Sequence, residues 1–236
     1  MKAILVHGMG RTPMSLLLLA GRLRRHGFAV RLFGYSTLRS FNTCVARLVS
    51  SATAVGRHES FILVGHSLGS VLIRAALPRL EPIRPVACFF LAPPSKTAKA
   101  ARFFATKALY RLLARECGQL LADDRFMETL ALPIVPVRVY AGTAGYKGRF
   151  SPFEGEDNDG ILAVSETQIG AEDNIVRVHA IHTFIMNSAQ VCADIAATTA
   201  SLRNVLDPMK ACPHNACDPA GAHRSRPRSL DEGRGS

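Results

Sequence analysis

The chain has 236 residues, 48% of them hydrophobic, and its 29 Lys and Arg against 18 Asp and Glu give a formal net charge of +11. This apolar content excludes a disordered chain, and the length predicts one domain with a sizeable core. Purely apolar runs, such as residues 16–20 and the longer residues 86–92, are far shorter than the roughly 18 residues that a membrane span needs. Lys2 leads straight into a strand-like run instead of a secretory signal, so we expect a cytoplasmic location.

Positive charge is concentrated in the first half of the chain. Residues 1–122 hold 18 basic and 3 acidic residues, whereas residues 123–206 hold 6 basic and 11 acidic residues. Such a field attracts nucleic acid, anionic membranes and anionic substrates alike. The chain has no Trp, only 7% aromatic residues, no zinc-finger spacing and no aromatic ribonucleoprotein motif. We therefore expect no nucleic-acid partner.

Strand-like apolar runs alternate along the chain with segments of helical periodicity. Strands are predicted over residues 3–6, 29–33, 61–64, 86–91, 135–141 and 174–180. Helices are predicted over residues 14–26, 41–55, 70–80 and 184–206. The alternation predicts an α/β fold with a mostly parallel sheet of about six strands and helices on both faces.

Two segments break this alternation. More than forty residues separate the strand ending at Leu91 from the strand beginning at Val135, far more than a crossover helix needs. We therefore expect one domain over residues 1–206 with a helical cap or lid insertion at about 95–132. Residues 207–236 are rich in Pro, Gly, Ser and Arg and are predicted to be a disordered tail.

The six cysteines do not indicate a disulfide framework. Four of them, Cys44, Cys88, Cys117 and Cys192, lie in apolar segments and are predicted to be reduced core thiols. Cys212 and Cys217, with His214 between them, are candidates for a metal site or a small disulfide. Their spacing fits no strong zinc pattern and no second Cys or His pair follows, so we expect no metal.

A nucleophile elbow is predicted where the strand at 61–64 meets the helix at 70–80. The motif Gly65-His66-Ser67-Leu68-Gly69 places a serine in a sharp Gly-x-Ser-x-Gly turn. Side chains at Gly65 and Gly69 would collide with the backbone there. The turn exposes the Ser67 hydroxyl and directs the N–H groups of the helix N-terminus to where an oxyanion would form. We interpret His66, like His7, as a structural or hydrogen-bonding residue without a role in proton transfer.

An acid and a base are expected after the last two strands. Asp157 and Asp159 are the two candidate acids, and the residues alone leave both open. His179 and His182 compete as the base. Strand alternation keeps His179 within or at the end of its strand, whereas His182 lies in the loop and can reach Ser67. We therefore favour His182.

Four short segments of the chain together resemble the motifs of a known protein family. They are Val6-His7-Gly8-Met9-Gly10, Gly65-His66-Ser67-Leu68-Gly69, Asn158-Asp159-Gly160-Ile161-Leu162 and His182-Thr183-Phe184. Together they resemble α/β-hydrolases of the small bacterial lipase and esterase type, over about residues 2–200. The resemblance implies the α/β-hydrolase fold, the chain order Ser67, Asp159, His182, and an oxyanion hole formed by the N–H groups of Met9 and Leu68. No early antiparallel strand precedes Lys2, so the sheet is expected to be a minimal one.

These features predict a serine hydrolase that cleaves small-molecule or lipid carboxylic esters without a cofactor or metal. Thioester hydrolysis and acyl transfer would use the same residues. A non-catalytic α/β-hydrolase-like binding protein is the alternative from another class. Such a protein does not need a nucleophile, an acid and a base together, which favours the enzyme.

The insertion contains a basic amphipathic pattern over residues 97–115. Lys99, Arg102, Lys107, Arg111 and Arg115 fall largely at helical spacing beside an apolar stripe. One interpretation is a fixed cap over the acyl pocket whose charges face water. The other is a lid that opens toward lipid and makes peripheral contact with an anionic membrane.

Overall fold

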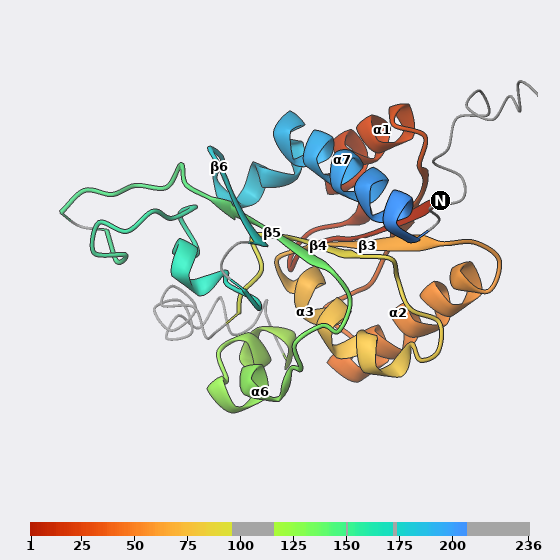
Figure 1. Ribbon diagram of the computed structural model, residues 1–236. Coiled ribbons are helices and arrows are strands. Elements are labelled where there is room, and N and C mark those ends of the chain that lie inside the picture. Colours follow the sequence, from red (N-terminus) through yellow and green to blue (C-terminus); the bar gives the residue numbers. More distant parts are fainter. Residues whose placement is uncertain (96–115, 150, 172–173, 207–236) are drawn as a thin grey trace, which may run out of the picture.

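The computed structural model describes residues 1–95, 116–149, 151–171 and 174–206, which are built around a six-stranded sheet (Figure 1). The strands are β1 (Lys2–Val6), β2 (Ala29–Phe33), β3 (Phe61–His66), β4 (Cys88–Leu91), β5 (Val137–Gly142) and β6 (Ile175–Val178). Every neighbouring pair is parallel, and the order across the sheet is β2-β1-β3-β4-β5-β6. The predicted α/β class with a sheet of about six strands is confirmed.

Helices cover both faces of the sheet. On one face lie α1 (Leu17–Arg25) and α7 (Ala189–Leu206), and on the other lie α2 (Phe41–Gly56) and α3 (Leu68–Ala76) (Figure 1). Strand β1 shows why both faces are apolar: Ala3 and Leu5 belong to the core cluster under α1 and α7, whereas Ile4 and Val6 belong to the cluster under α2 and α3. Successive side chains of a strand point to opposite faces, so a strand buried on both sides must be apolar throughout.

The parallel arrangement brings distant loops to one edge of the sheet. Register pairs Val6 with Gly65 at the ends of β1 and β3, and Gly142 with Val178 at the ends of β5 and β6. The loops that follow these four strands therefore start at the same carboxyl edge. In open α/β sheets this edge is where ligands bind.

The helix predicted over residues 184–206 is wrong as a single element. Residues 182–187 form a 3₁₀ helix, η5 (His182–Asn187), and α7 begins only at Ala189. Between them Ser188 is extended, with φ −67° and ψ 130°, and its Oγ accepts a hydrogen bond from the Val191 N–H at 3.5 Å. A serine favours such a cap over a helix interior, which explains the break.

Proline shifts the ends of two other predicted helices. The segment predicted at 14–26 begins as a 3₁₀ helix, η1 (Pro13–Leu16), before α1. The segment predicted at 70–80 begins at Leu68 and continues beyond Ala76 as a 3₁₀ helix, η2 (Leu77–Arg79). Pro78 has no N–H to donate, so an α-helix cannot continue through it.

The insertion is described only in its last part. There α6 (Asp124–Thr129) is capped by the Asp123 carboxylate, and Phe126 packs edge-on against Phe41 of α2 at 5.1 Å between ring centroids. The predicted amphipathic helix at 97–115 and the predicted tail at 207–236 lie outside the described residues. Lid opening, membrane contact and tail disorder therefore stay predictions. Within the described ranges, no helix has the length and apolarity needed to cross a bilayer.

Candidate active site

Ser67 occupies a strained turn between β3 and α3. Its backbone has φ 51° and ψ −120°, a region that residues with a side chain rarely adopt. A Cβ at Gly65 would lie 2.7 Å from the Ser70 nitrogen, and one at Gly69 would lie 2.4 Å from the Val6 carbonyl oxygen. Both distances are too short, so the turn requires both glycines. The sharp turn predicted from the sequence is therefore present.

The structure brings together the three side chains singled out from the sequence. Nε2 of His182 lies 3.0 Å from the Ser67 hydroxyl oxygen, and Nδ1 of His182 lies 2.7 Å from Oδ2 of Asp159. The imidazole and carboxylate side chains are only 9% and 1% exposed. Because water is largely excluded, electrostatic interactions between them are stronger than at the surface.

Backbone hydrogen bonds fix the candidate acid. Oδ1 of Asp159 accepts from the N–H groups of Ile161 and Leu162 at 2.9 and 2.7 Å, which leaves Oδ2 for the imidazole. The Asp159 carbonyl accepts from the His182 N–H at 2.9 Å, so the acid and base loops are joined by main chain as well as by side chain. This network orients the carboxylate before any substrate binds.

The two alternatives from the sequence lie elsewhere. Asp157 forms ion pairs with Lys147 and Arg177, and its side chain is 28% exposed, against 1% for Asp159. His179 directly follows β6 and is exposed. The structure therefore brings Asp159 and His182, rather than Asp157 and His179, to Ser67.

Replacing Asp157 by asparagine tests this distinction. We expect turnover to change less than about threefold, since exposed ion pairs contribute little energy. The hydrogen bond and charge of Lys147, followed by the charge of Arg177, lower the pKa of Asp157 below its ordinary value. The ion pairs should therefore stabilise the fold above the pKa of the unfolded state, and this contribution should be lost as the pH falls through the folded pKa. Melting temperatures of variant and wild type should converge in acid, and a loss of turnover larger than that of Asp159→Asn would contradict the assignment.

Two backbone N–H groups, those of Met9 and Leu68, are the candidates for an oxyanion hole. Leu68 is the first residue of α3, where an N–H has no partner within the helix. Met9 follows β1 in a turn, and within the described part of the chain its N–H has no hydrogen-bond acceptor. The assignment of both groups to an oxyanion hole stays a prediction from the resemblance.

His7 and His66 are both buried, as their interpretation as structural residues requires. His7 stacks on Tyr35 at 4.3 Å between ring centroids, and burial lowers its pKa. Nε2 of His66 lies 3.0 Å from the carbonyl oxygen of His182. This contact joins residues 116 positions apart, and no pattern in the sequence predicts it.

Metal-ligating groups do not gather in the part of the chain that is described. There, no three His, Cys, Asp or Glu side chains come together in a way that could hold an ion. Cys44, Cys88, Cys117 and Cys192 are buried free thiols, and burial raises the pKa of Cys117 to about 11. Such thiols are poor nucleophiles and metal ligands. The pair Cys212 and Cys217 lies outside the described residues.

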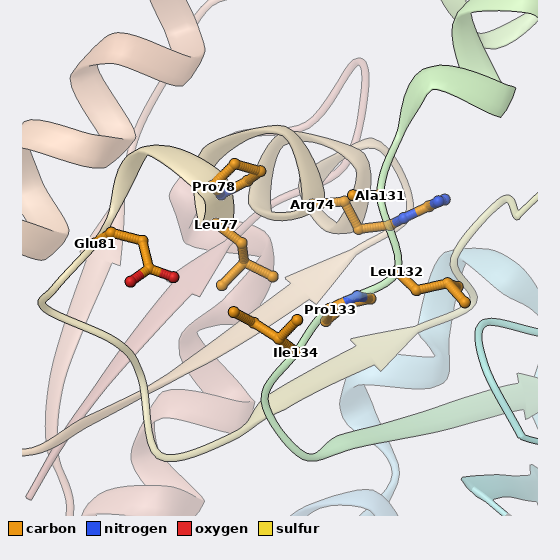
Figure 2. A pocket seen from close by; sticks show the side chains of 8 residues that line it. All are labelled: Arg74, Leu77, Pro78, Glu81, Ala131, Leu132, Pro133 and Ile134. Atoms are coloured by element: carbon orange, nitrogen blue, oxygen red, sulfur yellow. The ribbon is translucent and has the colours of Figure 1, made fainter.

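A pocket of about 260 Å³ lies at the C-terminal end of α3, between η2 and residues 131–134 (Figure 2). Ser67, Asp159 and His182 do not line it. Figure 2 shows the Arg74 side chain running from α3 past Ala131, and its Nη2 donates to the Leu130 carbonyl at 2.6 Å. The pocket is therefore separate from the candidate catalytic groups, and Arg74 ties the segment before β5 to α3.

Solved structures share this fold. The mature form of lipase BlEst2 from Bacillus licheniformis is similar with a TM-score of 0.66 and 14% identity, over 85% of this chain and 91% of that one. A metagenomic carboxyl esterase, MGS0156, has a TM-score of 0.64 and 17% identity, over 87% and 76%. Tomato Methylketone Synthase I, complexed with 2-tridecanone, has a TM-score of 0.54 and 16% identity, over 86% and 98%. At these identities the likeness is one of fold.

The sequence itself carries the family relationship. No curated protein matches the chain in sequence. The model of the alpha/beta hydrolase family, however, matches residues 3–208, which include all six strands apart from Lys2 at the start of β1, and the three candidate catalytic side chains. The chain therefore belongs to the alpha/beta hydrolase family.

Proposed function

We propose that this protein is a serine hydrolase that cleaves carboxylic esters through an acyl-enzyme. The observation that carries the proposal is the continuous hydrogen-bonded chain from Asp159 through His182 to Ser67, with links of 2.7 and 3.0 Å. A nucleophile, a base and an orienting acid in this order are what covalent acyl transfer requires.

The proposed cycle begins with attack of the Ser67 oxygen on the substrate carbonyl carbon while His182 Nε2 takes the hydroxyl proton. Asp159 holds the imidazole in the tautomer with a proton on Nδ1 and stabilises the imidazolium. The N–H groups of Met9 and Leu68 bind the oxyanion. When the tetrahedral intermediate collapses, the bond to the leaving oxygen breaks and His182 gives its proton to the departing alcohol.

Water completes the cycle. It attacks the acyl carbon, His182 accepts its proton, and the second tetrahedral intermediate collapses with the proton returned to Ser67. The carboxylic acid then leaves. Every proton transfer uses a group of this chain or water, so the proposal requires no metal and no cofactor.

Apolar side chains near the acid and base support a substrate with an apolar acyl or alcohol part. Ile161 follows Asp159 by two residues, and Ile181 and Phe184 flank His182. Their exposed fractions are 39%, 41% and 55%, so apolar surface is present in the chain segments next to Asp159 and His182. The similar structures named as a lipase and a carboxyl esterase favour ester chemistry. The similar structure named as a synthase shows that this fold also occurs in a protein named for another reaction.

Covalent capture tests the proposal directly. A fluorophosphonate should label the wild-type protein at one residue, and peptide mapping should identify that residue as Ser67. Labelling of another residue, or none, would reject the mechanism. A matched series of p-nitrophenyl esters and thioesters of graded chain length then separates ester from thioester hydrolysis, and added alcohol as acceptor reveals acyl transfer.

A further inference from the structure

The imidazole of His66 is enclosed between the base loop and the nucleophile turn. It is 3% exposed, and its ring centroid lies 5.2 Å from that of His182. Nε2 of His66 is 3.0 Å from the carbonyl oxygen of His182. A carbonyl oxygen can only accept a hydrogen bond, so Nε2 carries the proton and donates it.

The opposite edge of the ring faces the oxyanion loop. A Cβ at Gly8 would lie 2.8 Å from Nδ1 of His66 and 3.2 Å from the Cβ of Ser67. Nδ1 itself is buried and has no hydrogen-bond partner among the described residues; in this tautomer it carries no proton and can only accept. The ring thus spans the space between the main chain of His182 and the residue before Met9.

The enclosure also keeps the ring neutral. Burial lowers the pKa of His66 to about 3, and the charges of His182, Arg11 and His7 act in the same direction. A backbone hydrogen bond to His182 opposes this shift without cancelling it. A cation at position 66 would disfavour an imidazolium at His182, 5.2 Å away, so a neutral donor is the form compatible with base catalysis.

We propose that His66 is a positioning residue: its Nε2–H holds the main chain of His182 so that the His182 ring stays in line between Asp159 and Ser67. The inference rests on the proposed function and adds to the three side chains a fourth that touches neither substrate nor reacting atoms. Asp159 holds the ring and the N–H of His182, and His66 holds its carbonyl oxygen. Neither contact alone defines the position of Nε2 relative to the Ser67 hydroxyl.

Replacing His66 by glutamine or by asparagine, whose side-chain amides extend to different distances, tests this role. The side-chain nitrogen of Gln extends about as far as Nε2 of histidine, whereas that of Asn reaches only the level of Nδ1. We expect His66→Asn to lower kcat about a hundredfold with KM little changed, because small misplacement of a catalytic group has effects of this size. We expect His66→Gln to recover kcat to within about fivefold of wild type, since it restores the donor. His179→Asn, an exposed histidine near the same loop, is the matched control and should leave kcat unchanged.

Proton NMR supplies a readout that does not depend on catalytic turnover. The hydrogen-bonded Nδ1 proton of His182 should give a low-field resonance in wild type and His66→Gln, and a broadened or absent one in His66→Asn. Equal kcat in the Asn and Gln variants, with the resonance intact in both, would overturn the proposal. So would a loss of kcat in both variants that merely follows their melting temperatures.

A measurement on the unaltered protein remains if the variants do not fold. Ring ¹⁵N shifts should show His66 protonated at Nε2 and unprotonated at Nδ1, without titration between about pH 5 and 9, where an ordinary histidine changes charge. The opposite tautomer, or titration in this range, would reject the inference. The proposed function fails on a different result, the absence of Ser67 labelling, so the two failures are distinguishable.

Discussion

Ser67→Ala is expected to lower ester turnover by roughly five to six powers of ten, as removal of the serine nucleophile does in a well-studied serine protease. In the proposed mechanism this hydroxyl forms the acyl-enzyme, so its loss would remove the covalent route entirely. The fold should persist, because alanine places the same Cβ at φ 51° that serine already does. Single-turnover and steady-state rates on the best p-nitrophenyl ester, together with a thermal melt, measure both quantities.

Ser70→Ala is the matched control for this prediction. Ser70 lies in the first turn of α3, is fully buried, and donates its hydroxyl to the Gly65 carbonyl at 2.8 Å. Its loss should destabilise the fold by about 1 to 3 kcal/mol, the usual cost of leaving a buried group unpaired, with turnover reduced less than about tenfold. If Ser67→Ala kept more than about a tenth of wild-type turnover, Ser67 would not be the nucleophile.

The nucleophile turn could be predicted because its geometry depends on residues adjacent in the chain. A strand that runs into a helix with no room for a loop forces the intervening residue into an unusual conformation, and Gly65 and Gly69 leave space for it. The parallel sheet was predictable for a similar reason, since continuous apolar strands separated by amphipathic helices admit few other arrangements. Local rules therefore carried both predictions.

The choice of acid needed information that local rules do not contain. Asp157 and Asp159 are two residues apart in one loop, and only contacts with distant segments separate them. Asp157 is held by Arg177 on β6, whereas Asp159 meets His182 beyond that strand. Similarity to a family favoured Asp159, but no property of the loop sequence did. The break at Ser188 was missed because helical periodicity continues across it.

The contact between His66 and the His182 carbonyl could not be predicted from the sequence, for a different reason. A histidine beside a glycine turn is compatible with many roles, and its partner here is a backbone carbonyl, which every residue possesses. Only the fold, by bringing β3 and the loop after β6 to one edge of the sheet, identifies His182 as the residue concerned. A contact to the backbone does not depend on the residue type of the partner, so residue types in the sequence cannot predict it.

Asp159→Asn should lower turnover about ten-thousandfold while leaving the nucleophile in place, as the corresponding change does in a serine protease. An amide can donate to Nδ1 of His182, which would then carry its proton on Nε2 and could no longer accept that of Ser67. The carboxylate contact at 2.7 Å with 1% side-chain exposure makes this tautomer control strong. Steady-state kinetics should show the loss in kcat and kcat/KM alike, because the interaction matters chiefly in the transition state.

His182→Ala completes the test, because removal of the base should cost at least as much as the wrong tautomer. Effects within one catalytic unit are not additive, so the double variant with Asp159→Asn should be little worse than His182→Ala alone. His179→Ala, at an exposed position three residues earlier, should retain nearly full turnover. If the loss of turnover in the double variant equalled the product of the two single losses, Asp159 would act independently of His182. If His179→Ala lowered turnover more than His182→Ala, the base would be His179.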